Sequence, residues 1–100
     1  MTSYADLVTT DMRLVLLRLL SQAPSYTFNS SILHKLMGEQ TGYKIPRDKA
    51  VTELCWLQEQ GLVTVKDGIG CIIATITQRG LDVADGSATV PGVNRPSPRG

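Results

Sequence analysis

The segment at residues 46–80 constrains the fold of this chain more than any other part of the sequence. Pro46 suits the first turn of a helix, because proline lacks only a backbone N–H that would have no partner there. Gly61 suits the end of the same helix. Two runs rich in β-branched residues follow at once, and a glycine-rich turn separates them. The segment therefore predicts a helix that leads directly into a hairpin with strands at residues 62–66 and 71–76.

The turn of this hairpin is expected at residues 67–70, which read Asp-Gly-Ile-Gly. A four-residue turn would place Val65 opposite Ile72. The same register would place Val63 opposite Ala74, so that apolar side chains share one face of the hairpin. A three-residue turn would move the apolar residues of one strand to the other face, and we reject it for that reason.

Three further helices are expected from apolar residues at helical spacing and from capping residues at the helix ends. The first long helix should begin after the N-cap candidates at residues 9–10, with a separate short helix before it. The second should run from its N-cap Asn29 to Gly42. The last should run from its N-cap Thr77 to Gly86, and because it has few apolar residues we expect it to pack only lightly.

The order of these elements predicts an α+β domain that is mainly helical, namely a winged helix-turn-helix with one β-hairpin as its wing. A chain of 100 residues has room for one such domain. We expect the domain at residues 1–86 and a tail containing proline and glycine at residues 87–100. Within the tail, residues 90–93 could dock as an extended strap, and the residues after Asn94 should be mobile.

Composition argues against several classes of protein. No apolar run is long enough to span a bilayer and the N-terminus lacks the features of a signal peptide, so a cytoplasmic protein is expected. His34 is the only histidine, and no serine or cysteine has a recognisable catalytic partner, so we expect no enzyme and no catalytic residue. We also infer no metal, cofactor or small-molecule ligand. Cys55 and Cys71 are interpreted as reduced thiols, with a redox-sensing pair as the alternative.

The exposed side of the helix at residues 46–61 is where a winged helix would enter a DNA groove. Lys49 and Thr52 are expected to face the bases, because such side chains can bind base edges or phosphates. Contacts with the DNA backbone are expected from five more residues: His34, Lys35, Lys44, Arg47 and, in the wing, Lys66. Asp48 and Glu53 lie on the same side of the helix, and the formal net charge is only +1, so a solvated face of mixed charge is the alternative.

The wing itself is expected to contribute little to DNA binding. Lys66 is its only cation, and Asp67 beside it would meet phosphates unfavourably. Gly68 and Gly70 leave a short and nearly bare tip, which could enter a minor groove without adding electrostatic attraction.

A protein-interaction surface is the alternative to DNA binding. Leu14 and Leu17 lie on the helical wheel opposite the main apolar stripe of the first helix. They should be covered by the N-terminal segment or by the same helix of a second copy of the chain, and we favour the second copy. Without direct DNA binding, they would form an adhesive surface for a partner. Trp56 lies away from the main core. It should be covered by the N-terminal segment, the tail or a partner subunit, or else form part of a binding surface. In this reading the winged-helix scaffold binds protein and not DNA.

Two stretches of sequence resemble winged-helix regulators of the MarR/ArsR type. Residues 57–63 match the pattern Leu-x-x-x-Gly-Leu-Val, which commonly ends the recognition helix of that family. Residues 76–80 match Leu-Thr-x-x-Gly after the wing, with Ile76 in place of leucine. This resemblance implies the winged-helix fold of such regulators, and the position of the helix at residues 46–61 in that fold favours a transcription regulator that binds double-stranded DNA. The chain as a whole is also similar to small winged-helix proteins of Mu-like prophages, which implies a phage or prophage origin and a homodimer.

Overall fold

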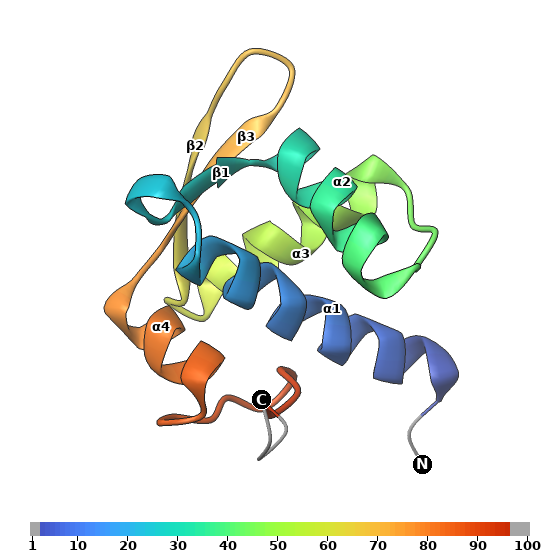
Figure 1. The fold of residues 1–100 in the computed structure, drawn as a ribbon, viewed down its shortest axis with the longest axis vertical. Helices are drawn as coiled ribbons and strands as arrows, with labels where there is room; N and C mark the ends of the chain where they lie inside the picture. The colour runs from blue at the N-terminus through green and yellow to red at the C-terminus, as the bar shows by residue number, and fades with distance from the viewer. Residues whose placement is uncertain (1–2, 97–100) are drawn as a thin grey trace.

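The computed structural model describes residues 3–96, which form four α-helices, one short 3-10 helix and a three-stranded antiparallel sheet (Figure 1). In chain order the elements are α1 (Tyr4–Ser21), η1 (Pro24–Tyr26), β1 (Thr27–Asn29), α2 (Ser30–Thr41), α3 (Arg47–Glu59), β2 (Val63–Asp67), β3 (Ile72–Ile76) and α4 (Gln78–Asp85). The protein is therefore a small α+β domain that is mainly helical, as the sequence predicts. The order of its elements is compatible with a winged helix.

Helix α1 begins earlier than expected. The Ser3 hydroxyl accepts a hydrogen bond from the Asp6 N–H, and the Asp6 carboxylate accepts one from the Ser3 N–H. This reciprocal pair satisfies two N–H groups at the helix end and starts the helix at Tyr4. The prediction of a separate short helix, with a second start after residues 9–10, is wrong for this reason.

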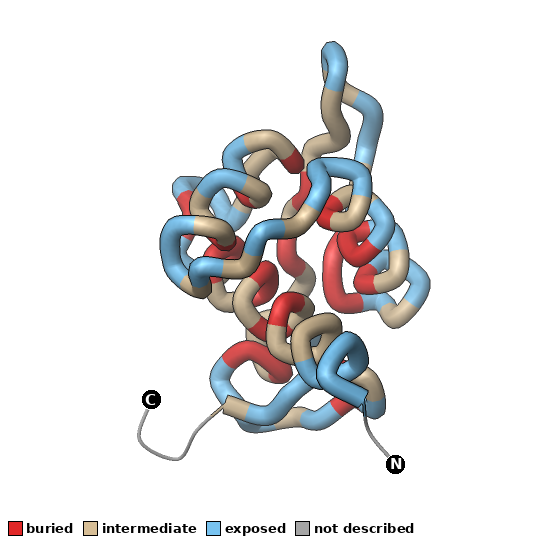
Figure 2. Tube along the Cα trace, turned by 90° about the vertical axis from the view of Figure 1, so that its right-hand side faces the viewer, coloured by how far each residue is buried: buried red, intermediate tan, exposed pale blue. Residues whose placement is uncertain are grey.

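The hydrophobic core lies where α1 packs against the other helices and the sheet, and Figure 2 shows the buried stretches gathered in the middle of the molecule. Every element except the short η1 and β1 contributes fully or nearly fully buried apolar residues. They include Met12, Leu16 and Leu20 of α1, Leu33 and Met37 of α2, Leu54 and Leu57 of α3, Val63 and Ala74 of the sheet, and Val83 of α4. Burying each large side chain contributes about 2 kcal/mol, so this shared core accounts for the assembly of the helices.

Leu14 and Leu17 are buried inside the chain itself, which corrects the prediction that they face a partner. Leu14 is 4% exposed and Leu17 is fully buried. Leu17 follows Arg13 by one helical turn, and the Arg13 guanidinium donates a hydrogen bond to the tail at the Gly92 carbonyl. Helix α4 and the tail both run along α1 (Figure 1). The second apolar face of α1 is therefore covered by α4 and the tail, and not by a second subunit.

The hairpin has the expected apolar face but a different register. Val65 lies opposite Ala74, and not opposite Ile72 as predicted. The turn has four residues, as expected, but runs from Gly68 to Cys71, where the Gly68 N–H donates to the Cys71 carbonyl at 2.9 Å. A register shift of two residues leaves every side chain on its original face. The predicted face is thus confirmed, whereas the predicted residue pairs are wrong.

Strand β1 adds a third strand to the sheet, on the free edge of β3. The hydroxyl oxygens of Thr27 and Thr75, which lie opposite each other, are 2.9 Å apart. A three-residue strand is too short for an alternation of apolar and polar residues to reveal it, so it was not predicted from the sequence.

The last residue of β1, Asn29, also caps α2 by accepting a hydrogen bond from the Ile32 N–H, and Gly42 ends α2 with φ 74°. Both predicted ends of α2 are confirmed.

Helix α4 has the predicted caps but packs more closely than expected. Thr77 caps its start, Gly86 follows its end with φ 89°, and Val83 is buried. The helix starts against the backbone after α3, since a Cβ atom added at Gly80 would lie 2.1 Å from the Leu62 carbonyl oxygen. The close approach at Gly80 and the burial of Val83 and Ala84 together hold α4 against the core.

The tail docks on the domain, as predicted for residues 90–93. Val90 and Val93 are buried in the core, and the Asn94 N–H donates to the Thr10 carbonyl at 3.1 Å. The segment expected to be mobile begins after Asn94, and its last part, residues 97–100, lies outside the described residues.

Gly80→Ala should lower the free energy of unfolding by about 3 kcal/mol, because the new methyl group would collide with the main chain at Leu62. Chemical denaturation followed by circular dichroism measures the loss. The matched control is Gly38→Ala in α2, where the nearest atom to the new Cβ is 3.7 Å away and alanine should add about 0.5 to 1 kcal/mol. Equal effects of the two substitutions would contradict the close approach.

Candidate nucleic-acid interface

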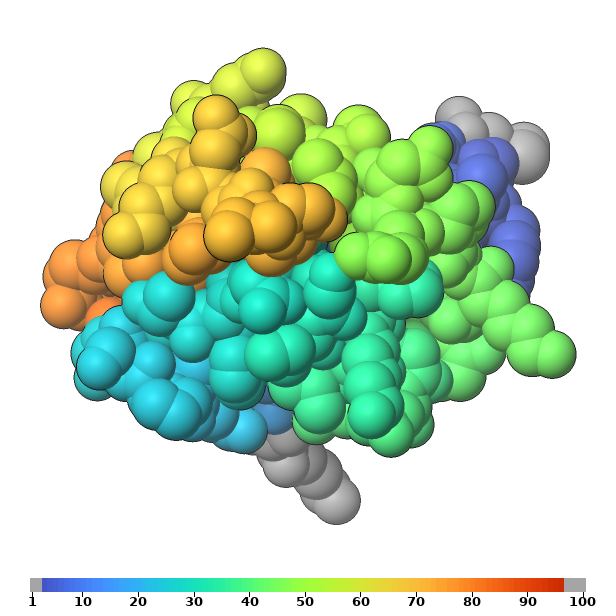
Figure 3. Space-filling model, turned by 90° about the horizontal axis from the view of Figure 1, so that it is seen from above, coloured from blue at the N-terminus to red at the C-terminus, as the bar shows by residue number. Residues whose placement is uncertain are grey.

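Three elements of the predicted interface meet at the first two residues of α2. The Ser30 hydroxyl accepts a hydrogen bond from the Ile72 N–H, just below the turn of the hairpin, at 3.1 Å. Arg47, the first residue of α3, donates a short hydrogen bond to the Ser31 hydroxyl. We refer to this meeting point as the Ser30–Ser31 junction. Figure 3 shows the hairpin, α2 and the start of α3 side by side on one face of the molecule.

The sequence analysis missed both serines of the junction. Asn29 was identified as the cap of α2, and serine in the next two positions is ordinary in a first helical turn. Nothing in the local pattern indicates that Ser30, which is 5% exposed, binds a strand far along the chain. Only the pairing of β1 with β3, which brings Asn29 opposite Ile73, places Ser30 beside that strand.

The turn between α2 and α3 is fixed by two side chains. His34 Nε2 lies 2.6 Å from the Ile45 carbonyl oxygen, and because a carbonyl only accepts, Nε2 must carry the proton. The Tyr43 hydroxyl donates to the Asp11 carboxylate at 2.9 Å. This hydrogen bond raises the pKa of Tyr43, and burial and the negative charge of Asp11 add to the effect. His34 was predicted to contact the DNA backbone, but its ring positions the turn between the two helices.

Four of the predicted cationic contacts are exposed on elements of the junction face. Arg47 lies at the junction, and Lys35 follows Ser31 by one helical turn of α2. Lys66 lies in β2 opposite Ile73, and Lys44 lies in the turn before α3.

The junction face also carries exposed acids. Asp48 follows Arg47 in α3 and Asp67 follows Lys66 in β2, so two of the four exposed cations have an acidic neighbour in sequence, whereas Lys35 and Lys44 have none. The four exposed cations named here therefore exceed these two acids by two charges, whereas the formal net charge of the whole chain is +1.

Lys49 and Glu53, which were predicted on the exposed side of α3, belong to an ion-pair cluster around the buried Glu53 carboxylate. Glu53 is 3% exposed, and its Oε1 lies 2.6 Å from Arg13 Nε while its Oε2 lies 2.9 Å from Lys49 Nζ. The Arg13 guanidinium also lies 3.7 Å from the centre of the Trp56 ring, and its Nη1 donates to the Gly92 carbonyl at 2.9 Å. This side of α3 therefore faces α1 and the tail, a placement that does not support the predicted contact of Lys49 with bases.

The cluster holds Glu53 in its charged form. Burial alone would raise the pKa of Glu53, but hydrogen bonds and charges from Lys49 and Arg13 outweigh burial and lower the pKa below the ordinary value of 4.5. The carboxylate is ionised at neutral pH and compensated by two cations. Glu53, whose negative charge was expected to oppose DNA binding, is therefore buried and does not lie on the exposed face of α3.

Trp56 is half-buried beneath Arg13 and the tail, so of the three covers that the sequence left open, namely the N-terminal segment, the tail and a partner subunit, the structure shows the tail. Gly92 approaches the ring so closely that an added Cβ would lie 2.9 Å from two ring atoms, Cζ2 and Cη2. Together with the burial of Leu14 and Leu17, this contact removes all three residues that were expected to form an adhesive surface.

The exposed side of α3 carries a stripe of mainly polar residues, namely Asp48, Thr52, Cys55 and Glu59. Thr52, predicted to face the bases, is exposed, and its hydroxyl donates to the Asp48 carbonyl one turn earlier. Cys55 is an exposed free thiol, and Cys71 is a half-buried free thiol at the end of the hairpin turn. The redox alternative stays a prediction.

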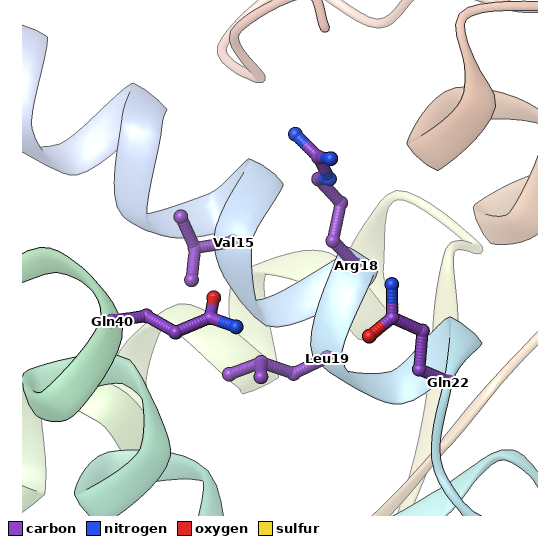
Figure 4. A pocket seen from close by; sticks show the side chains of 5 residues that line it. All are labelled: Val15, Arg18, Leu19, Gln22 and Gln40. Atoms are coloured by element: carbon purple, nitrogen blue, oxygen red, sulfur yellow. The ribbon is translucent and has the colours of Figure 1, made fainter. Parts of the chain in front are cut away.

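A pocket of about 190 Å³ lies between α1 and the C-terminal part of α2. Figure 4 shows the side chains of Val15 and Leu19 beside the Gln40 amide, with Arg18 pointing away from Gln40. Gln40 lies near the opposite end of α2 from the junction, so this pocket is not part of the candidate interface.

Within residues 3–96, no group of three or more histidine, cysteine, aspartate and glutamate side chains could hold a metal ion, and no helix is long and apolar enough to cross a membrane.

Gly92→Ala should loosen the tail, because the new methyl group would overlap the Trp56 ring and φ at this position is +95°. Trp56 is the only tryptophan, so its fluorescence reports directly on the contact. We expect a red shift of its emission and faster quenching by acrylamide. Thr89→Ala, at an exposed position beside the strap, is the control and should leave the emission unchanged; an unshifted emission in Gly92→Ala would refute the contact.

Glu53→Gln should lower the free energy of unfolding at pH 7 by about 2 kcal/mol, because two cations lose their buried counter-charge. The lowered pKa of Glu53 means that the unfolded chain binds more protons than the folded chain as the pH falls below 4.5. Wild type therefore loses this stabilisation on acidification. Urea titrations should show the gap between wild type and variant closing below pH 4.5, and a constant gap down to pH 2.5 would contradict this role.

Comparison with known proteins places the chain in a family. No family model matches the chain, and no solved structure matches it. The chain is 44% identical over 94 residues to "Uncharacterized protein gp26" of Escherichia phage Mu, which covers 94% of this chain and 96% of the phage protein. It is 46% identical over 82 residues to an "Uncharacterized protein" of Haemophilus influenzae, and the alignment covers 79% of this chain and 76% of that protein. The chain therefore belongs to the family of phage Mu gp26.

Proposed function

We propose that this protein is a DNA-binding, regulator-like winged-helix protein of phage or prophage origin, and that the Ser30–Ser31 junction lies at the centre of its contact with double-stranded DNA. The observation that carries the proposal is the pair of hydrogen bonds from Arg47 to Ser31 and from Ile72 to Ser30. They hold the wing and the starts of α2 and α3 on one face. The phage Mu relative supports the origin.

The exposed cations suit contact with the DNA backbone. Lys35, Arg47 and Lys66 lie on three different elements around the junction, so they can meet phosphates along both sides of a groove. Pro46 provides no side-chain cap at the start of α3, so a phosphate oxygen could accept hydrogen bonds from the first turn of that helix. Phosphates, more than bases, are the groups that this surface fits.

The charge balance predicts modest affinity. The pairing of Glu53 with Arg13 and Lys49 removes one acid from the DNA side of α3, but Asp48 and Asp67 stay exposed near the junction. Binding that depends on a few phosphate contacts weakens steeply with salt. The sequence preference should be low, because Thr52 is the one exposed residue of α3 that was expected to read bases.

A homodimer is part of this proposal, with a different contact from the one first expected. Tyr4 and Leu7 are 77% and 56% exposed at the start of α1, whereas Leu14 and Leu17 are buried. Exposed apolar residues in the first two turns of α1 could pack against the same residues of a second copy. The alternative of a module that binds protein and not DNA depended on Leu14, Leu17 and Trp56, and it is disfavoured because none of the three offers an exposed apolar surface.

Gel-shift titration with duplexes from the locus that encodes the protein tests the proposal. Wild type should retain duplex DNA at about 50 mM salt and lose most of its affinity at about 200 mM. Arg47→Ala should weaken binding to all duplexes alike and reduce the salt slope by about 1. Arg79→Ala, an exposed cation on α4, is the control and should bind as wild type does. No retention by the folded wild type at low salt would rule out the proposed function.

A further inference from the structure

Ile69 is a fully exposed apolar residue, with 102% relative exposure, at the tip of the hairpin. Figure 1 shows this tip projecting beyond the rest of the domain. A single exposed apolar residue is common on protein surfaces and needs no explanation by itself. Three further observations indicate that Ile69 takes part in binding. They are the shape of the tip, its attachment to the junction and its lack of charge.

The tip is only one side chain wide. Ile69 lies between Gly68 and Gly70, and the turn is closed by the hydrogen bond from the Gly68 N–H to the Cys71 carbonyl. Gly70 has φ +70°, and nothing lies within 4 Å of the position of an added Cβ atom. Ile69 is β-branched, so few rotamers are open to it. The hairpin therefore ends in one stiff apolar side chain, with bare backbone at Gly70 and with the Cys71 and Ile73 side chains packed against Gly68, 3.3 Å from the position of an added Cβ atom.

The tip is also held in a fixed direction relative to the junction. Ile72, three residues after Ile69, donates its N–H to Ser30 at the start of α2. On the other strand, the Val65 N–H donates to the Gln58 side chain of α3 at 2.7 Å. Both strands of the hairpin are thus tied to the two helices that form the proposed DNA face. A side chain held in this way is positioned before binding and does not depend on a mobile loop.

The tip does not contribute electrostatic attraction to DNA. Lys66 is the only cation between Val63 and Ile76, and Asp67 follows it directly. A minor groove attracts proteins through arginine and lysine or admits apolar side chains between base steps, and this hairpin offers only the second kind of contact at its tip. Glycine on both sides of Ile69 lets the backbone approach the narrow groove closely.

We propose that Ile69 is an apolar wedge that enters the minor groove and partly unstacks one base step, so that bound DNA is bent at that step. This inference rests on the proposed DNA binding and goes beyond it, because it assigns to the wing a deformation of the duplex and not a further phosphate contact. Flexible pyrimidine–purine steps such as TA are the sites where unstacking is easiest. The protein should therefore prefer duplexes with a TA step placed beside the junction contacts, although no side chain reads that step through hydrogen bonds.

Two fluorescence measurements on saturated complexes test the wedge. Energy transfer between dyes at the two ends of a duplex reports bending, and 2-aminopurine at a central TA step reports unstacking. Wild type should raise both signals, Ile69→Ala should lose both with less than about a fivefold change in affinity, and Ile69→Leu should retain them. Ile69 is fully exposed, so each variant should fold, as circular dichroism will check. Arg47→Ala is the matched control: it should weaken affinity but leave the bend of the saturated complex unchanged.

The outcomes separate the wedge from the proposed function. A complex that stays straight, or a bend that Ile69→Ala leaves intact, overturns the wedge while DNA binding stands. Loss of all binding by folded Ile69→Ala also counts against it, because the junction cations are expected to hold straight DNA. Failure of wild type to bind any duplex at low salt overturns the proposed function and the wedge with it, and would leave Ile69 as a contact for another protein.

Discussion

The buried carboxylate of Glu53 is the interaction on which the arrangement of the helices depends. A charge with 3% exposure is costly unless it is paired, and Arg13 and Lys49 supply that pairing from α1 and from α3 itself. Arg13 then extends the cluster by stacking on Trp56 and by binding the tail at Gly92. One ion-pair cluster thus joins three segments that are distant in sequence and decides which side of α3 faces inward.

Because one side of α3 faces inward, the candidate DNA surface lies at the start of the helix and not along its whole length. With Lys49 directed to Glu53, the exposed cations near α3 are Arg47 at its start, Lys44 in the turn before it and, on neighbouring elements, Lys35 and Lys66. They surround the Ser30–Ser31 junction, where hydrogen bonds join the wing to both helices. Such a surface fits a DNA backbone better than base edges. A preference among sequences would then come from how easily the duplex bends and not from direct contacts with bases.

Local signals predicted the helix ends and most of the element order. Asn29, Thr77, Gly42 and Gly86 were all assigned correctly, because a cap depends on the conformation of a few neighbouring residues. The start of α1 was assigned too late, since two threonines at residues 9–10 resemble an N-cap as closely as Ser3 does. The hairpin register was displaced by two residues, because alternation fixes the face of a strand but not the position of its partner.

The sequence by itself determined the fold class, the hairpin after α3 and the exposed cations of the proposed interface, and it identified residues 90–93 as a segment that could dock. Only the tertiary structure decided that Leu14 and Leu17 are core residues, that Glu53 is paired and that Ser30 meets the wing. The physical reason is the same in each case. A helical wheel shows which side chains share a face, but burial and hydrogen bonding depend on what packs against that face, and here the partners come from distant parts of the chain.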